Sequence, residues 1–427
     1  MKGMSKMAEM DMGLSPQKKK KKKKRKQSFF KSIVTGLIPW KGDSTTEIFR
    51  KIIFLVSLGI LVFAFVLIVQ HFMITGDESG GIEGTITTTS GEETTIIALK
   101  NQTPTKEQIE KLPEGTVNEE YAALYDANND FAGWINIQGT NVNYPVMQSH
   151  DNEMFERCSR FETNGTCDLC LQIESDPYLA KRFMHCNTYT TYGYCEFCQQ
   201  IVEQPHLAEE FYLHHDFGRN YLFAGNIFAD YQGKISPDQM PNNTILYGHN
   251  MLYEYQFSAL SNYKQLDFLK VSPVIDFNTL YHDNKYKIFS VFLVNTTDEY
   301  GEVFDYYDQV YFANSSEFYN YILECMDRSL FETGVDIEYG DELLTLSTCD
   351  ESTGFNDMRL VIVARKVRPN ENPTVDINKI VRKDSIKYFD AYYAAYGNWW
   401  SGRTWDVSLV KGMAEYIKEN GLEDPAV

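Results

Sequence analysis

A cysteine, a histidine and an arginine stand where predicted strands end, and together these residue types can carry out acyl transfer. Cys349 follows the β-type run 343–348, and Arg359 opens the next apolar run ten residues later. A hairpin joining the two strands would bring Cys349 and Arg359 side by side. His249 comes just after a third run, 244–247, behind a glycine that allows close backbone approach. The pattern is typical of a site with a thiol nucleophile.

Each residue type has a chemical reason to be there. The thiolate is the attacking species, and an ordinary thiol with a pKa of about 8.5 needs a nearby cation to form it at neutral pH. His249 can return a proton to a leaving amine. Arg359 keeps its charge and suits a fixed donor to a developing oxyanion. Spacing alone does not settle the site, because a single cysteine or histidine is more often structural.

Longer segments around these residues resemble the class B sortases, membrane-anchored cysteine transpeptidases of Gram-positive bacteria. The resemblance covers about residues 104–368, apart from an insertion. It implies a mostly β fold with flanking helices, built on a closed eight-stranded barrel. The matching segments are TLSTC (345–349) with Arg359, YGHN (247–250), GWINIQGTNVNYPVMQ (133–148), FYLHHDF (211–217) and GNIFAD (225–230).

The resemblance also implies a reaction and its partners. Cys349 would attack the threonine carbonyl of a C-terminal sorting signal, of the NPxTN or (S/N)PxTG kind, and form a thioester. An amine of the peptidoglycan precursor or cross-bridge would resolve it, with His249 as acid and base and Arg359 orienting the substrate. No cofactor is implied for catalysis. The positions that match the substrate groove of the family are Tyr247, Ser347 and Asp350.

Three other functions compete with surface-protein anchoring. A pilin-polymerising sortase would use a pilin lysine as the second nucleophile. A hydrolytic cysteine peptidase would release product without an added amine. A catalytically idle cell-wall binding module would use the cysteine-rich insertion and the tail for binding.

The remaining pattern predicts the elements that hold the site. Short runs with strand character, separated by turn residues, suggest a barrel or sandwich. Helical spacing predicts helices over 119–130 and 315–331, the second with Ser315 or Ser316 as N-cap and Cys325 buried. The predicted strands are 134–137, 142–146, 226–229, 244–247, 274–277, 286–294, 343–348 and 360–367.

The insertion, at about residues 154–210, consists of two copies of a 28-residue unit and holds six of the eight cysteines. Its paired C-x2-C motifs favour a structural zinc site, whereas an extracytoplasmic location favours disulfides, and both interpretations stay open. The predicted zinc ligands are Cys167, Cys170, Cys195 and Cys198, with Cys158, Cys186 and His185 as further candidates. The insertion serves either as a scaffold or in recognition of a partner.

Charge and hydropathy divide the 427 residues further. Residues 1–51 carry 15 Lys and Arg against 4 Asp and Glu, whereas the rest of the chain carries 25 against 55. The acidic body excludes a nucleic-acid partner, because phosphate affinity depends on Lys and Arg. Between the two parts, residues 52–74 hold no formal charge, and about 20 apolar residues suffice to span a bilayer.

The positive-inside rule then predicts a single-pass protein of the cell membrane. Residues 1–51 form a basic cytoplasmic tail, 52–74 a transmembrane helix and 75–103 a flexible stalk, with the catalytic domain 104–368 extracytoplasmic. Residues 369–427 form a C-terminal helical extension, with helices over 384–396 and 407–420, whose aromatic residues are more typical of a packing face than of a ligand site.

Overall fold

The computed structural model describes residues 43–55, 57, 85–87, 93–149, 156–238, 240–251, 255–397 and 399–422. It divides the chain into two compact units, Met1–Glu78 and Ser79–Val427. In the first unit residues 45–55 are helical, and Lys51 donates a hydrogen bond to Asp43 (2.8 Å). The predicted span 52–74 lies mostly outside the described residues. Within the described ranges, no helix is both long and apolar enough to cross a membrane.

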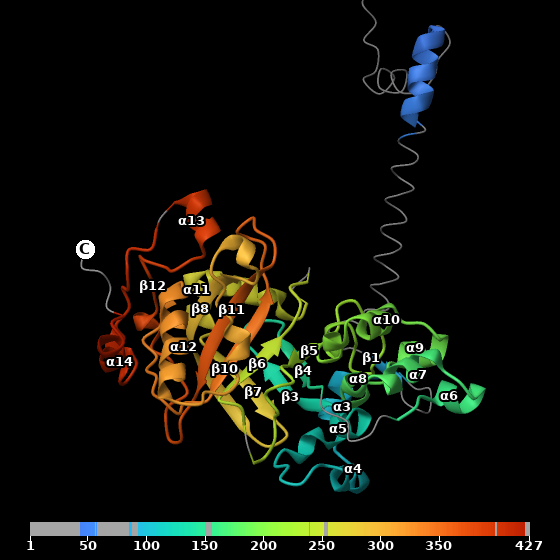
Figure 1. Cartoon of the computed structure of the whole chain (residues 1–427), viewed down its shortest axis with the longest axis horizontal. Helices are drawn as coiled ribbons and strands as arrows, with labels where there is room; N and C mark the ends of the chain where they lie inside the picture. Colours follow the sequence, from blue (N-terminus) through green and yellow to red (C-terminus); the bar gives the residue numbers. More distant parts are fainter. Residues whose placement is uncertain are drawn as a thin grey trace, which may run out of the picture. The chain divides into compact units, whose positions relative to one another are not determined.

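Eight strands of the second unit close into a mixed barrel in the order β10-β11-β8-β7-β3-β4-β5-β6 (Figure 1). The neighbours β4–β5 and β6–β10 are parallel, and the other pairs are antiparallel. The predicted eight-stranded barrel is confirmed, and each predicted strand overlaps one of these. Their bounds are β3 Phe131–Asn136, β4 Asn143–Met147, β5 Ile227–Ala229, β6 Asn243–Tyr247, β7 Val274–Thr279, β8 Asp283–Asn295, β10 Leu343–Cys349 and β11 Met358–Lys366.

The core consists of two buried clusters, which lie on opposite faces of the strands. Along β11, Leu360 and Ile362 belong to one buried cluster, whereas Val361 and Val363 belong to the other. Successive side chains of a strand point to opposite faces, so a continuous apolar run is buried on both sides. The second cluster joins apolar residues of α12 with residues of β8 and β11, and α12 packs directly on β8.

Helix α12 (Ser315–Arg328) confirms the predicted helix and the burial of Cys325, which is 0% exposed. The N-cap is Asn314, not Ser315 or Ser316, because its side chain accepts from the Glu317 N–H (3.1 Å). The other helices outside the insertion are α3 Ile96–Asn101, α4 Lys106–Glu110, α5 Ala122–Ala127, α11 Leu266–Val271, α13 Asp390–Tyr396 and α14 Met413–Glu419.

The two chain segments flanking the predicted catalytic domain differ in part from expectation. Residues 75–103 were expected to form a flexible stalk, yet 96–101 form helix α3, because Ile96 and Leu99 bury apolar side chains on the core. Two short strands, β1 Thr85–Thr87 and β2 Glu93–Thr95, pair before it. At the other end, the helix predicted over 384–396 begins only at Asp390, as α13. Before it, β12 Val381–Arg382 pairs with β9 Phe331–Glu332.

The two copies of the 28-residue unit fold alike between β4 and β5. In each copy the first helix ends at a glycine in the left-handed conformation, Gly165 (φ 72°) and Gly193 (φ 78°). Each helix pair begins at matching cysteines, so the sequence repeat is also a structural repeat. The helices are α6 Ser159–Asn164, α7 Asp168–Ser175, α8 Pro177–Arg182, α9 Asn187–Tyr192 and α10 Glu196–Glu203 (Figure 1).

Candidate active site

Cys349 is the last residue of β10, and its side chain is exposed to solvent. Its partner across the antiparallel pair is Arg359, near the start of β11. Directly opposite residues on one sheet face lie within about 5.5 Å at their Cβ atoms. The hairpin therefore places a thiol and a guanidinium next to each other, as the spacing predicts.

The parallel pairing of β6 with β10 brings His249 to the same end of the barrel. The Thr348 hydroxyl donates to the Gly248 carbonyl (2.7 Å), and the Asn250 amide donates to the Cys349 carbonyl (2.8 Å). These bonds flank the histidine on both sides. The backbone around His249 is thus tied to the backbone around Cys349.

Two groups contact the imidazole of His249, and a third holds its backbone. Its Nε2–H donates to the Leu213 carbonyl (3.1 Å), which can only accept, so Nδ1 carries the lone pair of the neutral ring. Its backbone N–H donates to the Gln256 side chain (3.0 Å), and the Phe223 ring stacks on it (6.0 Å, 13°). Burial lowers the pKa of His249, and the charge of Arg359 lowers it further.

Arg359 faces charged or polar groups from three elements. Its Nη1 donates to the Met358 carbonyl (3.1 Å). Burial raises the pKa of Glu210, at the end of the insertion, and Arg359 partly opposes that rise. Burial also raises the pKa of Tyr306, again opposed by Arg359. The guanidinium is therefore within electrostatic reach of His249, Glu210 and Tyr306, where it can stabilise negative charge.

The three predicted groove residues lie beside this site and bind protein groups. Ser347 and Asp350 are each 2% exposed, and Tyr247 is half-buried. The partners are Asp230 for Tyr247 (2.9 Å), Tyr306 for Ser347 (2.6 Å) and Lys264 for Asp350. Such bonded side chains support the wall of the site, and their contact with a substrate stays a prediction.

Sequence reasoning did not single out three residues that arrange the site. Asn250 had a signal, because it directly follows His249 in the YGHN segment. Leu213 lies in the matching segment 211–217, but it acts through its backbone carbonyl, which its residue type does not reveal. Gln256, seven residues after His249, lies outside the matching segments. Gly225 (φ 55°) permits this arrangement, because a Cβ there would lie 2.1 Å from the Leu213 carbonyl oxygen.

All eight cysteines are free thiols in the structure, and the six of the insertion form two clusters. Cys158, Cys167 and Cys170 make one, and Cys186, Cys195, Cys198 and His215 make the other. The predicted grouping of the two C-x2-C pairs in one site is therefore wrong, because each repeat folds around its own cysteines. His185 is in neither cluster and contacts the Glu156 carbonyl instead.

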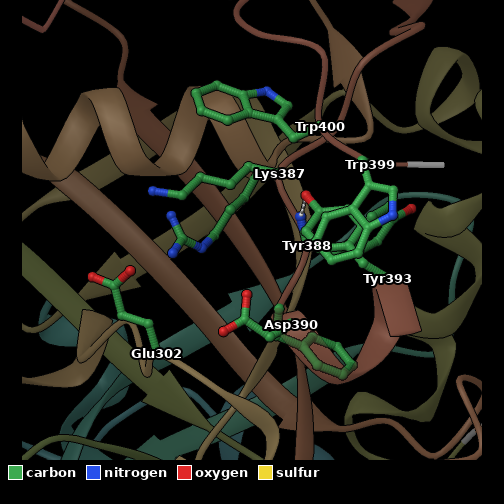
Figure 2. A pocket seen from close by; sticks show the side chains of 9 residues that line it. Glu302, Lys387, Tyr388, Asp390, Tyr393, Trp399 and Trp400 are labelled. Atoms are coloured by element: carbon green, nitrogen blue, oxygen red, sulfur yellow. Dashed lines mark hydrogen bonds between the residues drawn. The ribbon is translucent and has the colours of Figure 1, made fainter. Parts of the chain in front are cut away.

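A separate cavity of 280 Å³ lies on the C-terminal extension (Figure 2). Tyr393 and Trp399 stack there (5.0 Å, 20°), and burial lowers the pKa of Arg328 to about 10. Most of its aromatic rings contact one another, in agreement with a packing face. The lining residues are Glu302, Arg328, Lys387, Tyr388, Phe389, Asp390, Tyr393, Trp399 and Trp400, which include none of the predicted site residues.

Known proteins resemble this chain in sequence and in fold. Residues 220–367 match the family described as Sortase domain. Sortase B of Listeria monocytogenes is 25% identical over 263 residues, 62% of this chain and 80% of the relative. Sortase B of Staphylococcus aureus is 23% identical over 252 residues, 59% and 76% of the two chains. A solved Staphylococcus aureus sortase B–substrate complex is 22% identical, with a TM-score of 0.40, and covers 61% of this chain and 92% of that one.

Proposed function

Because the chain carries a sortase domain and is a sortase B-like cysteine transpeptidase, we propose that Cys349, His249 and Arg359 perform its acyl transfer. The observation that supports this assignment best is the pairing of Cys349 with Arg359 across β10 and β11. His249 comes to the same barrel end through β6. The set offers a nucleophile, an acid and base, and a fixed cation.

In the first step, the Cys349 sulfur bonds to the carbonyl carbon of the substrate threonine. Its proton passes to Nδ1 of His249, the nitrogen that the Leu213 contact leaves with a lone pair. Arg359 donates to the oxyanion of the tetrahedral intermediate. The C–N bond then breaks, the leaving amine takes the proton from His249, and a thioester remains.

In the second step, an acceptor amine attacks the thioester carbonyl and gives a proton to His249. The C–S bond breaks, and the sulfur of Cys349 leaves as thiolate and regains that proton. We propose that the donor is a surface protein with an NPxTN or (S/N)PxTG-like C-terminal signal, and that the acceptor is a peptidoglycan amine. The enzyme acts outside the cytoplasmic membrane, to which residues 52–74 anchor it.

The experiment uses the purified full chain with NPxTN, NPxTG and SPxTG peptides and an amine acceptor, read by intact-mass spectrometry. We expect a thioester adduct on the wild type that the amine converts to ligated peptide, and no adduct on Cys349→Ala. His249→Asn should slow acylation about 10²–10⁴-fold, and Arg359→Lys about 10²–10³-fold.

Each alternative outcome has a distinct meaning. An adduct on folded Cys349→Ala would assign the nucleophile elsewhere. Release of acid instead of amide would identify a hydrolase, and exclusive use of a pilin lysine would identify a polymerase. No adduct with any peptide, on folded protein with a reactive Cys349 thiol, would contradict the proposal and favour a binding module.

A further inference from the structure

The second repeat holds a cluster with the composition of a structural metal site. One ligand atom from each of Cys186, Cys195, Cys198 and His215 lies within 4.8 Å of the others, and all four side chains are buried. Three thiolates and one imidazole are the ligand set of a closed tetrahedral zinc site. As thiolates, three cysteines buried in contact would repel one another, and a shared cation would remove that cost.

His215 is prepared for a metal on one nitrogen. Its Nδ1–H donates to the Phe211 carbonyl (2.8 Å), and its ring stacks on the Phe211 ring (3.7 Å, 6°). Its Nε2 is buried and has no hydrogen-bond partner among the described residues. Metal-binding histidines commonly donate the second N–H to a carbonyl, which fixes the lone pair on the nitrogen that binds. The lone pair of Nε2 is therefore available to a metal ion held by the three cysteines.

The first repeat has the three equivalent cysteines, Cys158, Cys167 and Cys170, but no histidine in its cluster. The Cys158 sulfur lies 3.7 Å from the Cys167 sulfur and 3.4 Å from the Cys170 sulfur. Thiolates on a tetrahedral zinc, at about 2.3 Å from the ion, stand about 3.8 Å apart. A disulfide would need about 2.05 Å. Three cysteines in one cluster would also leave one thiol over after any pairing.

We propose that the insertion binds two Zn²⁺ ions, one in each repeat. Cys186, Cys195, Cys198 and His215 form a closed site, and the three cysteines of the first repeat form a second. The repeat offset of 28 residues puts Asn187 where His215 stands, so the first site keeps its fourth position for an exchangeable ligand. We expect the closed site to hold its metal more tightly.

The closed site also supports the candidate active site, a consequence that rests on the proposed function. Leu213, whose carbonyl accepts the Nε2–H of His249, lies two residues before the ligand His215. A zinc ion at His215 would fix the segment 211–215 to the second repeat. Loss of that ion would let the Leu213 carbonyl move and would release the imidazole. His215 is thereby a positioning residue for His249.

The test measures zinc per full chain by inductively coupled plasma mass spectrometry after purification without added metal. We expect about two equivalents in the wild type and one in each of Cys198→Ser and Cys170→Ser. The matched control Cys349→Ala removes a cysteine outside the insertion and should keep both. Visible absorption after Co²⁺ exchange of the wild type reports tetrahedral thiolate ligation without any variant.

Three results would overturn the proposal or a part of it. A protein without zinc overturns both sites. Its cysteines would then be either paired in disulfides, which lowers the intact mass by two hydrogens per bond, or present as six freely reactive thiols. One equivalent that only Cys198→Ser removes supports the closed site and overturns the first. Zinc removal should slow acylation tenfold or more, by analogy with about 10²-fold losses from small displacements. Unchanged acylation in metal-free protein overturns only the positioning role of His215. The two zinc sites are tested separately, because zinc content is measured without an activity assay.

Discussion

The imidazole of His249 has a lowered pKa and lies under the ring of Phe223. These two features predict how kcat/KM depends on pH. Because burial holds its pKa below the ordinary value of about 6.5, the ring stays neutral at neutral pH and can accept the thiol proton. We expect kcat/KM for acylation to be flat as pH falls toward about 6.5 and to decrease below it as the ring gains a proton. The measurement is kcat/KM against pH, with the imidazole titration followed by NMR.

The variant Phe223→Ala tests the cause of that shift. Phe223 is 63% exposed yet stacks on the His249 ring, so its removal admits water to the imidazole without opening the core. The pKa of His249 should then rise toward its ordinary value, and the acidic limb should move to higher pH. An acidic limb that stays in place, or a rate that rises as the ring is protonated, contradicts neutral His249 as the base.

At the scale of elements, Asp327 of α12 joins the C-terminal extension to the body. Its carboxylate, 3% exposed, accepts from Arg403 (3.0 and 2.9 Å) and from the Trp405 indole (2.7 Å). Asp327→Ala would leave the Arg403 guanidinium, 8% exposed, without this buried carboxylate. We expect the free energy of unfolding to fall by about 3–5 kcal/mol, as measured by urea denaturation.

A surface ion pair between the same two parts of the chain supplies the control. Lys411 lies 3.1 Å from Glu338, but its side chain is 81% exposed. Lys411→Ala should leave the midpoint of urea unfolding almost unchanged, because solvent screens an exposed ion pair. Equal losses in the two variants would mean that burial does not decide the strength of the Asp327 contact.

Sequence alone predicted the elements whose signals are local. The alternating or β-branched runs located all eight barrel strands, because a strand with one buried face alternates and a strand with two buried faces is apolar throughout. The motifs placed Cys349 beside Arg359. The N-cap of α12 and the grouping of the cysteines were wrong, because each depends on how neighbouring residues fold together. Leu213 lies in the matching segment 211–217, but its role was missed, because a hydrogen bond from a backbone carbonyl does not depend on the type of side chain.

Over the whole molecule, charge and hydropathy predict that the two ends of the chain lie on opposite sides of a membrane. Residues 1–51 carry 15 Lys and Arg before the uncharged stretch 52–74, and an excess of these residues marks the cytoplasmic side. Asp77 and Glu78 follow the stretch. All the residues of the proposed site and both cysteine clusters come after it and would face the outside.

Protease treatment of intact, wall-stripped cells that make the full chain tests this orientation. We expect added protease to digest residues beyond 75 and to leave an epitope tag at the N-terminus protected until the cells are lysed. A second form, with Lys18–Lys26 changed to glutamate, should show some reversed molecules, because the cationic excess sets the orientation. Digestion of the N-terminal tag in intact cells would contradict it. If the chain had the reverse orientation, with its N-terminus outside, Cys349 would lie in the cytoplasm and could not reach the peptidoglycan acceptor.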